Sequence, residues 1–399
     1  FDYMKNNIFL LIAASIFILS FSSCDDLLDV TPKDKITPET FFSTEADLQA
    51  FSTNFYNSLP KDRDLYKDDA DNITHSTPNS AATDSRTVPA SGGGWEWGYL
   101  RRFNTLLQYS VNCKDKTVRT RYQALTRFFR AYFYFEMVKR FGDVPWYDTE
   151  LFVSETDQLN KPRDSRELVM KNILEDLDFA ITNLSTTPSV YTVTKWTALS
   201  LKSRVCLFEG TFRKYHNLNL STNADFFLQE SITASRELMK ESNYTLYTEG
   251  GTNQAYRKLF TSQNAPTTEV IMARNYNLTY DIYNTVGTYH TSVGEGRPGV
   301  TRKIIASYLM NDGSRFTDNP NWETMTFVDE CKNRDPRLAQ SICTPSYQPI
   351  VSNRKNIPDL NACVTGYQLI KYEDEAVGGK SDIDLFYFRL AEVYLNYAE

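Results

Sequence analysis

Residues 118–146 constrain the fold of this chain more than any other stretch. Apolar side chains recur there at intervals of four and three residues, which places them on one face of an α-helix: Ala124, Phe128, Ala131, Phe135 and Val138. A second apolar stripe lies beside the first, at Leu125, Phe129 and Tyr132. The two stripes cover about half of the helix circumference, more than a surface helix needs. We therefore expect a helix that is buried between two neighbours and that ends at Gly142, before Pro145.

The same pattern recurs 74 residues further along the chain. Its members are an aromatic residue, an alanine, a leucine and an arginine at constant spacing: Tyr122, Ala124, Leu125 and Arg130, matched by Trp196, Ala198, Leu199 and Arg204. Helices with small residues beside large ones approach each other closely, and pairs of such helices stack into tetratricopeptide-like arrays. We therefore predict one helical unit that is used twice. Two unrelated amphipathic helices with a chance similarity are the alternative.

The N-terminal segment has the features of a secretion signal. Met4 and Lys5 precede an apolar run over residues 8–21, which is too short to span a bilayer comfortably. Small residues then lead to Cys24, and acidic residues follow it. This order is typical of a bacterial lipoprotein signal, although Phe21 is a less usual residue at the first lipobox position. We expect cleavage after residue 23 and acylation of Cys24, which anchors the chain durably to a membrane; a secretion signal with an incidental cysteine is the alternative.

A polar, turn-rich stretch over residues 60–94 predicts a long surface loop. Its five aspartates, from Asp62 to Asp71, carry oxygen ligands suitable for calcium, but the glycine and terminal glutamate of an EF-hand are absent. We therefore expect a solvated acidic loop. Trp95 and Trp97 follow where the next helix begins. Their rings are placed either to stack on a flat ligand face or to pin the loop to the core.

Further helices are expected from apolar periodicity and capping residues. Thr44 begins one with Asp47 in capping-box position. Another covers residues 161–184, with Leu168, Ile173, Leu177 and Ile181 inside, and is expected to pair with the helix that starts at Lys195. Others are expected at about residues 224–241, 301–314 and 384–399. Residues 245–300 are less regular, with a strand-like piece at 270–276, and we place a soft subdomain boundary near residues 250–265.

Composition and motifs argue against several functions. The net charge of −7 does not favour nucleic acid, which needs a basic face. The three histidines lie far apart in the sequence, so a histidine metal site is not expected. Gly294, Gly296 and Gly299 form a literal G-x-G-x-x-G, but Glu295 would repel phosphate and Pro298 lacks an N–H. We reject a dinucleotide loop there.

The cysteines carry no zinc-ligand spacing and no C-x-x-C. Cys206 lies inside the second helical unit and is expected to be a small buried hydrophobe. Cys331 and Cys343 either close a loop in an oxidising compartment or stay unpaired. Glu175 and Asp176 are adjacent carboxylates, but neighbouring helix positions point in different directions, so they do not form the paired carboxylates of a glycoside hydrolase.

Nine stretches, in order, resemble the SusD/RagB family of Bacteroidetes outer-membrane lipoproteins across nearly all of the chain. They are CDDLLDVTPKDKITPETFFSTEADL (24–48), WEWGYLRRFN (95–104), RFFRAYFYFEMVKRFGDVPW (127–146), ILEDLDFA (173–180), KWTALSLKSRVCLFEGTF (195–212), SYLMNDGS (307–314), NRDPRL (333–338), TGYQLIKY (365–372) and RLAEVYLNYAE (389–399). Any one of these stretches is weak alone, and their order gives the resemblance its weight.

The resemblance implies a mainly α-helical fold with tetratricopeptide-like helix pairs as an α-superhelical scaffold, an irregular loop-rich ligand-facing portion and minor β-structure. It implies a signal peptide over residues 1–23, an N-terminal region over 24–250 and a C-terminal region over 265–399. Members continue past the point where this chain ends, so we expect the last helix pair to be missing. No cofactor, metal or catalytic residue is implied.

The resemblance also implies a function. Such a protein is a cell-surface, lipid-anchored lid, not an enzyme, that captures oligosaccharide or peptide and passes it to a SusC-like, TonB-dependent transporter in the outer membrane. Aromatic rings stack on the C–H faces of sugars, and polar side chains bind hydroxyls. The expected ligand contacts are Trp95, Trp97, Tyr289, Trp322, Asp69 and Arg86. A purely structural lid subunit and a glycoside hydrolase are the alternative functions.

Overall fold

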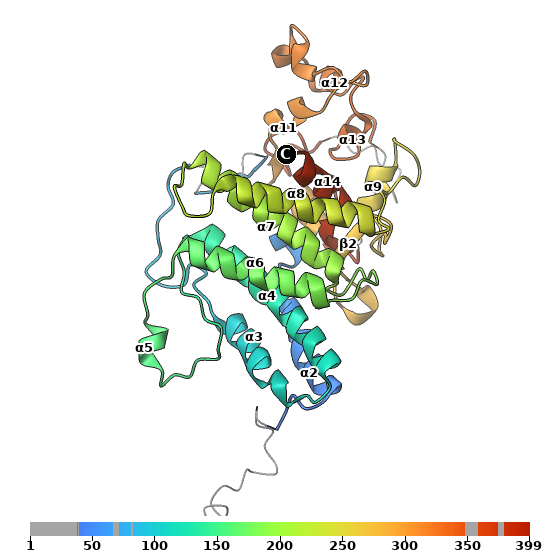
Figure 1. Ribbon diagram of the computed structural model, residues 1–399. Helices are drawn as coiled ribbons and strands as arrows, with labels where there is room; N and C mark the ends of the chain where they lie inside the picture. The colour runs from blue at the N-terminus through green and yellow to red at the C-terminus, as the bar shows by residue number, and fades with distance from the viewer. Residues whose placement is uncertain (1–37, 39, 67–71, 81–82, 348–357, 374–378) are drawn as a thin grey trace, which may run out of the picture.

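The computed structural model describes residues 38, 40–66, 72–80, 83–347, 358–373 and 379–399. Within them the chain is mainly α-helical, as predicted, with two small two-stranded sheets (Figure 1). The helices are α2 (Glu45–Thr53), α3 (Gly98–Tyr109), α4 (Lys116–Phe141), α5 (Thr156–Leu159), α6 (Arg166–Asn183), α7 (Lys195–Tyr215), α8 (Ala224–Glu241), α9 (Ala255–Phe260), α10 (Val286–Thr291), α11 (Arg302–Ser307), α12 (Phe327–Glu330), α13 (Pro336–Ala339) and α14 (Leu390–Ala398). The strands are β1 (Ile73–Thr74), β2 (Val270–Arg274), β3 (Gly299–Val300) and β4 (Leu385–Arg389).

Helix α4 matches the predicted buried helix. It begins at Asp115, whose carboxylate accepts hydrogen bonds from the N–H groups of Thr117 and Val118, and it ends at Gly142 with φ 71°. All five residues of the first apolar stripe are buried. In the second stripe Phe129 is buried, while its two neighbours are half-buried against the same core. The helix therefore contacts neighbours on both sides, as the sequence indicates.

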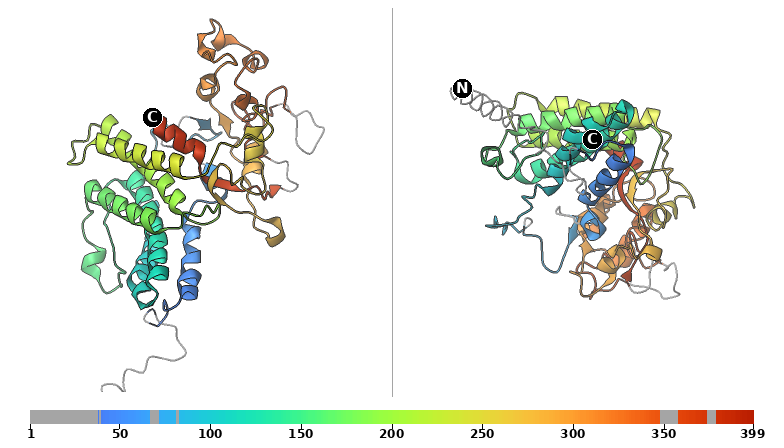
Figure 2. Two further views of the ribbon diagram at one scale, coloured as in Figure 1. Left: turned by 45° about the vertical axis from the view of Figure 1, so that its right-hand side comes forward. Right: turned by 90° about the horizontal axis from the view of Figure 1, so that it is seen from below.

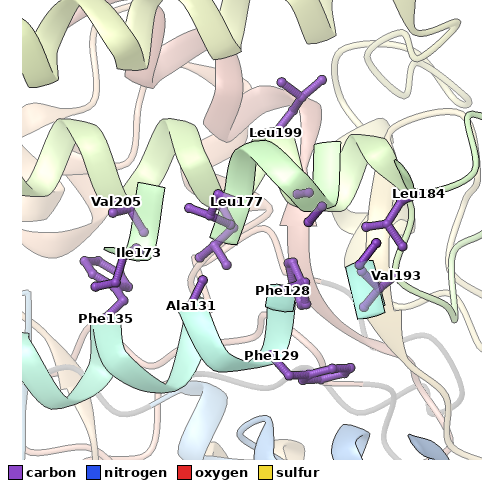
Figure 3. Close-up of a cluster of buried hydrophobic side chains, with 14 of the residues drawn as sticks. Phe128, Phe129, Ala131, Phe135, Ile173, Leu177, Leu184, Val193, Leu199 and Val205 are labelled. Atoms are coloured by element: carbon purple, nitrogen blue, oxygen red, sulfur yellow. The ribbon is translucent and has the colours of Figure 1, made fainter. Parts of the chain in front are cut away.

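The helices form successive packed pairs, α4 with α6 and α7 with α8, and Figures 1 and 2 show these pairs as layers of one stack. Figure 3 shows Ala131 and Phe135 of α4 directed toward Leu177 and Ile173 of α6. Small residues bring α7 and α8 together in the same way, because a Cβ at Gly210 would lie 2.7 Å from Leu228. The predicted tetratricopeptide-like pairing is confirmed in kind. Helix α6 packs on α7, as expected, but it packs more extensively on α4.

One expected core residue of α6 is wrong. Leu168 is 40% exposed, whereas Val169 and Met170 are buried with Ile173 and Leu177. The buried face of α6 follows the 3.6-residue period from Ile173 back to Val169 and Met170, and Leu168 lies beside it in the first turn. The serine that caps this helix, Ser165, accepts a hydrogen bond from the N–H of Leu168. Capping, and not burial, therefore fixes the start of α6.

The two sheets join parts of the chain that are distant in sequence. Strand β2, within the strand-like piece expected at 270–276, pairs antiparallel with β4, so that Val270 lies opposite Arg389. The helix expected over residues 384–399 is therefore wrong in its first part: residues 385–389 are a strand, and α14 begins only at Leu390. Its aromatic sequence, LFYFR, favours extended backbone, and the pairing with β2 satisfies the backbone groups.

The second sheet leads into α11, which lies with α12 and α13 in the upper portion of Figure 1. Strand β1 pairs antiparallel with β3, with Ile73 opposite Val300, and so brings the loop over 72–76 onto residues 296–301. The helix expected over 301–314 is shorter than predicted, because α11 ends at Ser307 and residues 309 and 310 form bridges to residues 315 and 334. Asp335 caps α13 with Pro336 in its first turn, as expected.

Three apolar clusters hold these parts together. The largest lies within the helical stack, the second lies under β2 and β4, and the third lies under α11–α13 with Val300, Ile305 and Leu338 among its members. Cys206 is buried in the first, as expected, and burial raises the pKa of its thiol. Cys331 and Cys343 form no disulfide bond, so they do not close a loop in this structure.

Candidate ligand-binding site

A cavity of about 670 Å³ in the described part of the chain is of a size at which proteins hold small ligands. We call it the Trp322 cavity, because Trp322 precedes its wall residue Glu323. Arg302 of α11, Phe327 and Glu330 of α12, and residues 358–367 supply its other walls. The lining combines apolar side chains, such as Met325 and Leu360, with a few charged groups. This composition is typical of a binding pocket.

Glu330 organises the polar side of the Trp322 cavity. Its carboxylate is buried, forms an ion pair with Arg302, and accepts a hydrogen bond of 2.5 Å from the hydroxyl of Tyr367. The hydrogen bond from Arg302 to Glu330 raises the pKa of that guanidinium, and burial together with the bond to Glu330 raises the pKa of Tyr367. Both oxygens of Glu330 are therefore engaged in fixing the cavity wall.

Trp322 itself does not line this cavity, but Arg302, which does, fixes the position of Trp322. The Arg302 guanidinium donates to the carbonyls of Trp322 and Glu323, at 2.9 and 2.7 Å, and lies 5.4 Å from the centroid of the indole ring. Phe316 meets the ring edge-on at 6.1 Å. Trp322 is half-buried, so part of its surface stays open. An aromatic ring that is fixed by neighbours and partly exposed is suited to stacking on a flat ligand.

Tyr289 lies in a second polar cluster on the other side of β3. Its hydroxyl is hydrogen-bonded to Nε2 of His75, and the guanidinium of Arg63 lies 5.7 Å from its ring centroid. Arg63 also forms an ion pair with Glu295. Burial raises the pKa of the Tyr289 hydroxyl. Pairing of β1 with β3 brings His75 to Tyr289, 214 residues away in the sequence.

The glycine-rich segment links this cluster to the Trp322 cavity. Gly296 has φ 84° and its carbonyl accepts from the N–H of Ser76 at 2.9 Å. Gly299 lies in β3, where a Cβ would be 2.3 Å from Oγ1 of Thr365 in the cavity wall. The glycines thus permit close approach of two backbone segments. Sequence reasoning excluded a phosphate loop here and did not predict this packing role.

Trp95 and Trp97 form a third aromatic group, at the junction of α3 with the preceding loop. Their ring centroids lie 5.1 Å apart. Trp97 packs edge-on against Phe133, Tyr134 and Tyr147, at 5.7, 6.3 and 5.6 Å. Trp95 is 38% exposed, meets Phe141 at 4.9 Å and has the guanidinium of Arg163 4.9 Å from its ring. The contacts of Trp97 are those of the pinning alternative, while Trp95 keeps an open surface.

The structure therefore brings some predicted site residues together and leaves others apart. Trp95 contacts Trp97, whereas in the part of the chain that the structure describes no ring contact joins either of them to Tyr289 or Trp322. Arg86 is exposed in the loop before Trp95. Asp69 and Cys24 lie outside the described residues, as does the signal segment 1–23.

The expected acidic loop differs from prediction at Asp62. This carboxylate accepts hydrogen bonds from the N–H and hydroxyl of Thr285, and its own N–H donates to the hydroxyl of Tyr276 at 2.8 Å. Asp62 is thus an anchor for the loop rather than a solvated charge. Asp68 and Asp71 lie outside the described residues. Over the described ranges, no group of three or more metal-ligating side chains is present, and no helix is long and apolar enough to cross a membrane.

Sequence reasoning missed three residues that build the Trp322 cavity: Arg302, Glu330 and Tyr367. Tyr367 lies in the stretch TGYQLIKY, but its partner Glu330 is 37 residues earlier in a short helix without a strong periodic pattern. Arg302 is 28 residues from the same carboxylate. The sequence carried no clear signal for Arg302 or Glu330, which lie outside the nine family-like stretches. Only the folded chain brings them together.

These features define a class of protein, a tetratricopeptide-like helical scaffold that carries a loop-built candidate binding face lined by aromatic and arginine side chains. The model of the SusD family matches residues 259–399, and a model described as starch-binding associating with outer membrane matches residues 26–207. The chain belongs to the SusD/RagB family.

Relatives of known sequence and structure agree with this assignment. A SusD-like protein of Formosa agariphila is 24% identical over 388 residues, which are 94% of this chain and 70% of that protein. The crystal structure of a SusD-like protein from Bacteroides fragilis superposes with a TM-score of 0.71 at 23% identity, over 92% of this chain and 76% of that one. A structure solved with a xylogluco-oligosaccharide has a TM-score of 0.61 at 17% identity, over 88% of this chain and 70% of that one. At these identities the structures show the shared fold.

Proposed function

We propose that this protein is a cell-surface lipoprotein that binds oligosaccharide and delivers it to a SusC-like, TonB-dependent transporter in the outer membrane. The Trp322 cavity carries this proposal: a half-open indole held by Arg302 beside a 670 Å³ cavity with few, fixed polar groups. Sugar rings present C–H faces to such an indole and hydroxyls to such polar groups. Family membership and a relative solved with an oligosaccharide favour a glycan over a peptide.

The proposed ligand contacts fall into two kinds. Trp322, Tyr289 and Trp95 offer ring surfaces that are not fully covered, and Trp97 supports Trp95 from beneath. Arg86 and Asp69 remain proposed polar partners, the former exposed and the latter outside the described residues. To these we add Arg302 and Tyr367 as positioning residues, because they fix Glu330 and hold the cavity wall.

Anchoring and delivery rest on the sequence and the family. A short apolar segment that ends before Cys24 supports acylation of this cysteine and attachment to the outer membrane. The family description, starch-binding associating with outer membrane, supports the same location. We infer a surface position and a SusC-like partner from these two observations together.

We propose binding without catalysis. A glycoside hydrolase needs two carboxyl groups on either side of the scissile bond, one of them able to exchange a proton. In the Trp322 cavity the buried carboxylate is Glu330, and an arginine and a tyrosine occupy both of its oxygens. Glu323 is exposed and lies in the same wall. This arrangement favours holding a sugar over cleaving it.

A binding screen combined with a hydrolysis assay tests the proposal. The purified protein is applied to an array of neutral and acidic oligosaccharides and of peptides, and each bound glycan is then incubated with the protein and assayed for new reducing ends. We expect binding to a defined glycan class and no new reducing ends. Binding to peptides alone, or release of reducing ends, overturns the proposed function. The structural-lid alternative predicts no binding at all, with the protein still co-purifying with a transporter.

A further inference from the structure

A smaller cavity, of about 340 Å³, lies between β4 and the helices α7 and α14, apart from the Trp322 cavity. We call it the Lys371 cavity. Three cationic side chains line it: Arg204 of α7, Lys371, and Arg389 at the end of β4. Aromatic side chains of β4, including Phe386 and Phe388, form much of the remaining wall. No residue of this cavity belongs to the candidate ligand-binding site described above.

Two of the three cations have carboxylate partners. Arg204 forms a bidentate ion pair with Glu392, at 2.6 and 2.7 Å, and Arg389 contacts Glu269 at 2.7 Å. Lys371 differs, since among the residues that the structure describes no carboxylate lies within ion-pair distance of its Nζ. Its Nζ lies over aromatic rings instead, 3.9 Å from the centroid of Phe260 and 5.2 Å from that of Tyr256. When Lys371 is protonated, the cavity therefore has one cation without a carboxylate partner among the described residues.

The backbone holds Lys371 in this position. Lys371 and Tyr372 are the central residues of a turn closed by a hydrogen bond of 3.2 Å from the N–H of Glu373 to the carbonyl of Ile370. Tyr372 has φ 59°, which is uncommon for a bulky residue. Arg257 donates to the carbonyls at both ends of the turn, at Ile370 and Glu373. The ammonium group is thus directed by a turn that is fixed on two sides.

We propose that the Lys371 cavity binds the carboxylate of an acidic sugar, with Lys371 as the direct ion-pair partner. A lysine in a cavity that two arginines also line, with no carboxylate in ion-pair distance among the described residues, offers a place for an anionic group. The aromatic wall suits the C–H faces of a sugar ring, and about 340 Å³ is near the lower limit of small-molecule sites. An acidic monosaccharide unit combines both features. The class of ligand is therefore a uronic acid, free or at a chain end.

The charge state of Lys371 makes this binding sensitive to pH. Burial, and then the charge of Arg389, lowers the pKa of Lys371 to about 7. The charged and titratable groups that face it are Arg389 and Tyr387 of β4, Arg204 of α7, Glu392 of α14, Tyr256 of α9, His290 of α10, Glu269 and Tyr372. A bound carboxylate favours the protonated ammonium, so binding takes up a proton above pH 7. Affinity then falls as the pH rises.

Calorimetric titration of the full chain with D-glucuronate tests this proposal. We expect glucuronate to bind, D-glucose to show no heat in the same range, and Lys371→Met to weaken glucuronate binding by about tenfold or more, since a charge-assisted bond is lost. Lys380→Met is the matched control, because Lys380 is an exposed lysine outside the cavity, paired with Asp281. For the unaltered chain the affinity for glucuronate falls about tenfold from pH 6 to pH 8.

Several results overturn the proposal. Equal glucuronate affinity in Lys371→Met and the unaltered chain contradicts it, as does absence of glucuronate binding. If sulfate competes with glucuronate as well as glucuronate itself does, the cavity is a general anion site. If N-acetyl-aspartate does so, the ligand is an acidic peptide. Either result overturns the acidic sugar. If Lys371→Met does not fold, the pH profile of the unaltered chain decides, because a flat profile excludes Lys371. Neutral glycan binding at Trp322 is measured separately, so failure of one proposal is distinguishable from failure of the other.

Discussion

Arg130 and Asp176 form a bidentate ion pair inside the helical stack, with distances of 2.7 and 2.8 Å between α4 and α6. Both side chains are buried. The equivalent arginine of the second unit, Arg204, forms a bidentate pair with Glu392 of α14, and each guanidinium also faces an aromatic ring, at 5.1 Å for Arg130 and 4.1 Å for Arg204. The repeated arginine thus joins one helix of each unit to another element through a carboxylate.

Removal of one partner of the buried pair is expected to be costly. Asp176→Asn leaves Arg130 buried without a counter-ion, so we expect a loss of about 3–5 kcal/mol in the free energy of unfolding. Glu175→Gln is the matched control, because Glu175 is the adjacent residue and its pair with Lys171 is exposed; we expect a change below about 1 kcal/mol. Urea denaturation measures both. Equal effects of the two substitutions contradict a structural role for the buried pair.

Trp97 and Trp95 are expected to differ in their effect on stability. Trp97 packs on three aromatic residues of the core, so Trp97→Ala removes buried ring contacts and lowers the free energy of unfolding by about 2–4 kcal/mol. Trp95 is partly exposed, and Trp95→Ala is expected to cost about 1 kcal/mol. Thermal and chemical denaturation of the two variants compare them. A larger loss for Trp95 than for Trp97 contradicts the pinning role of Trp97.

Glu167 makes stability depend on pH in the acid range. Burial raises its pKa, but hydrogen bonds from Thr222, Arg213 and Ser221 outweigh burial and lower the pKa to about 2 from an ordinary value of 4.5. Because the folded pKa is depressed, the carboxylate stabilises the fold above about pH 4.5, and this stabilisation is lost as the pH falls toward 2.

Comparison of Glu167→Gln with the unaltered chain tests this pH dependence. We expect the variant to be less stable by about 1 kcal/mol at pH 6, after allowance for solvent screening of a partly exposed group. The difference shrinks as the pH is lowered from 4.5, since the carboxyl of the unaltered chain then takes up a proton in the unfolded state before it does so in the folded state. Urea midpoints between pH 6 and pH 3 measure it. A stability difference that stays constant over this range shows that Glu167 acts through shape and not through charge.

The helical stack could be predicted from the sequence because each apolar pattern and each stop signal lies within a single helix. The apolar spacing from Ala124 to Val138 and the stop at Gly142 are properties of one helix, and both are confirmed. The repeat from Arg130 to Arg204 predicted equivalent positions. It did not predict the carboxylate partners of these arginines: Asp176 is 46 residues from Arg130, and Glu392 is 188 residues from Arg204.

The binding face depends on pairings between distant segments, which periodicity does not encode. The sequence of strand β4 was predicted as the start of a helix, and its pairing with β2 shows that it is a strand. Tyr289 and Trp322 were predicted as ring contacts, but His75, Arg302 and Glu330 became visible only when β1 paired with β3 and residues 358–367 closed the cavity. The short, irregular elements of this face have too few residues to show a helical or strand period in the sequence. Contacts with distant parts of the chain therefore decide their conformation.

Gly299 is expected to be needed for the wall of the Trp322 cavity. Gly299→Ala places a methyl group against Thr365 and the sulfur of Cys363, so we expect a loss of about 1–3 kcal/mol in stability. Gly294→Ala is the control, since its nearest neighbour would be 3.8 Å away, and we expect a change within about 0.5 kcal/mol. Chemical denaturation distinguishes the two. Tolerance of alanine at residue 299 contradicts the close approach of β3 and residues 363–365.

The central claim, that a glycan stacks on Trp322, is tested most directly by calorimetric titration of the neutral oligosaccharide that the array identifies. Trp322→Ala is compared with Tyr215→Ala, which removes an aromatic ring that is 74% exposed at the end of α7, outside the Trp322 cavity. Loss of one sugar-stacking ring is worth about 1–3 kcal/mol, so we predict at least a fivefold weaker affinity for Trp322→Ala and an unchanged affinity for Tyr215→Ala. Unchanged affinity in a folded Trp322→Ala variant contradicts the account.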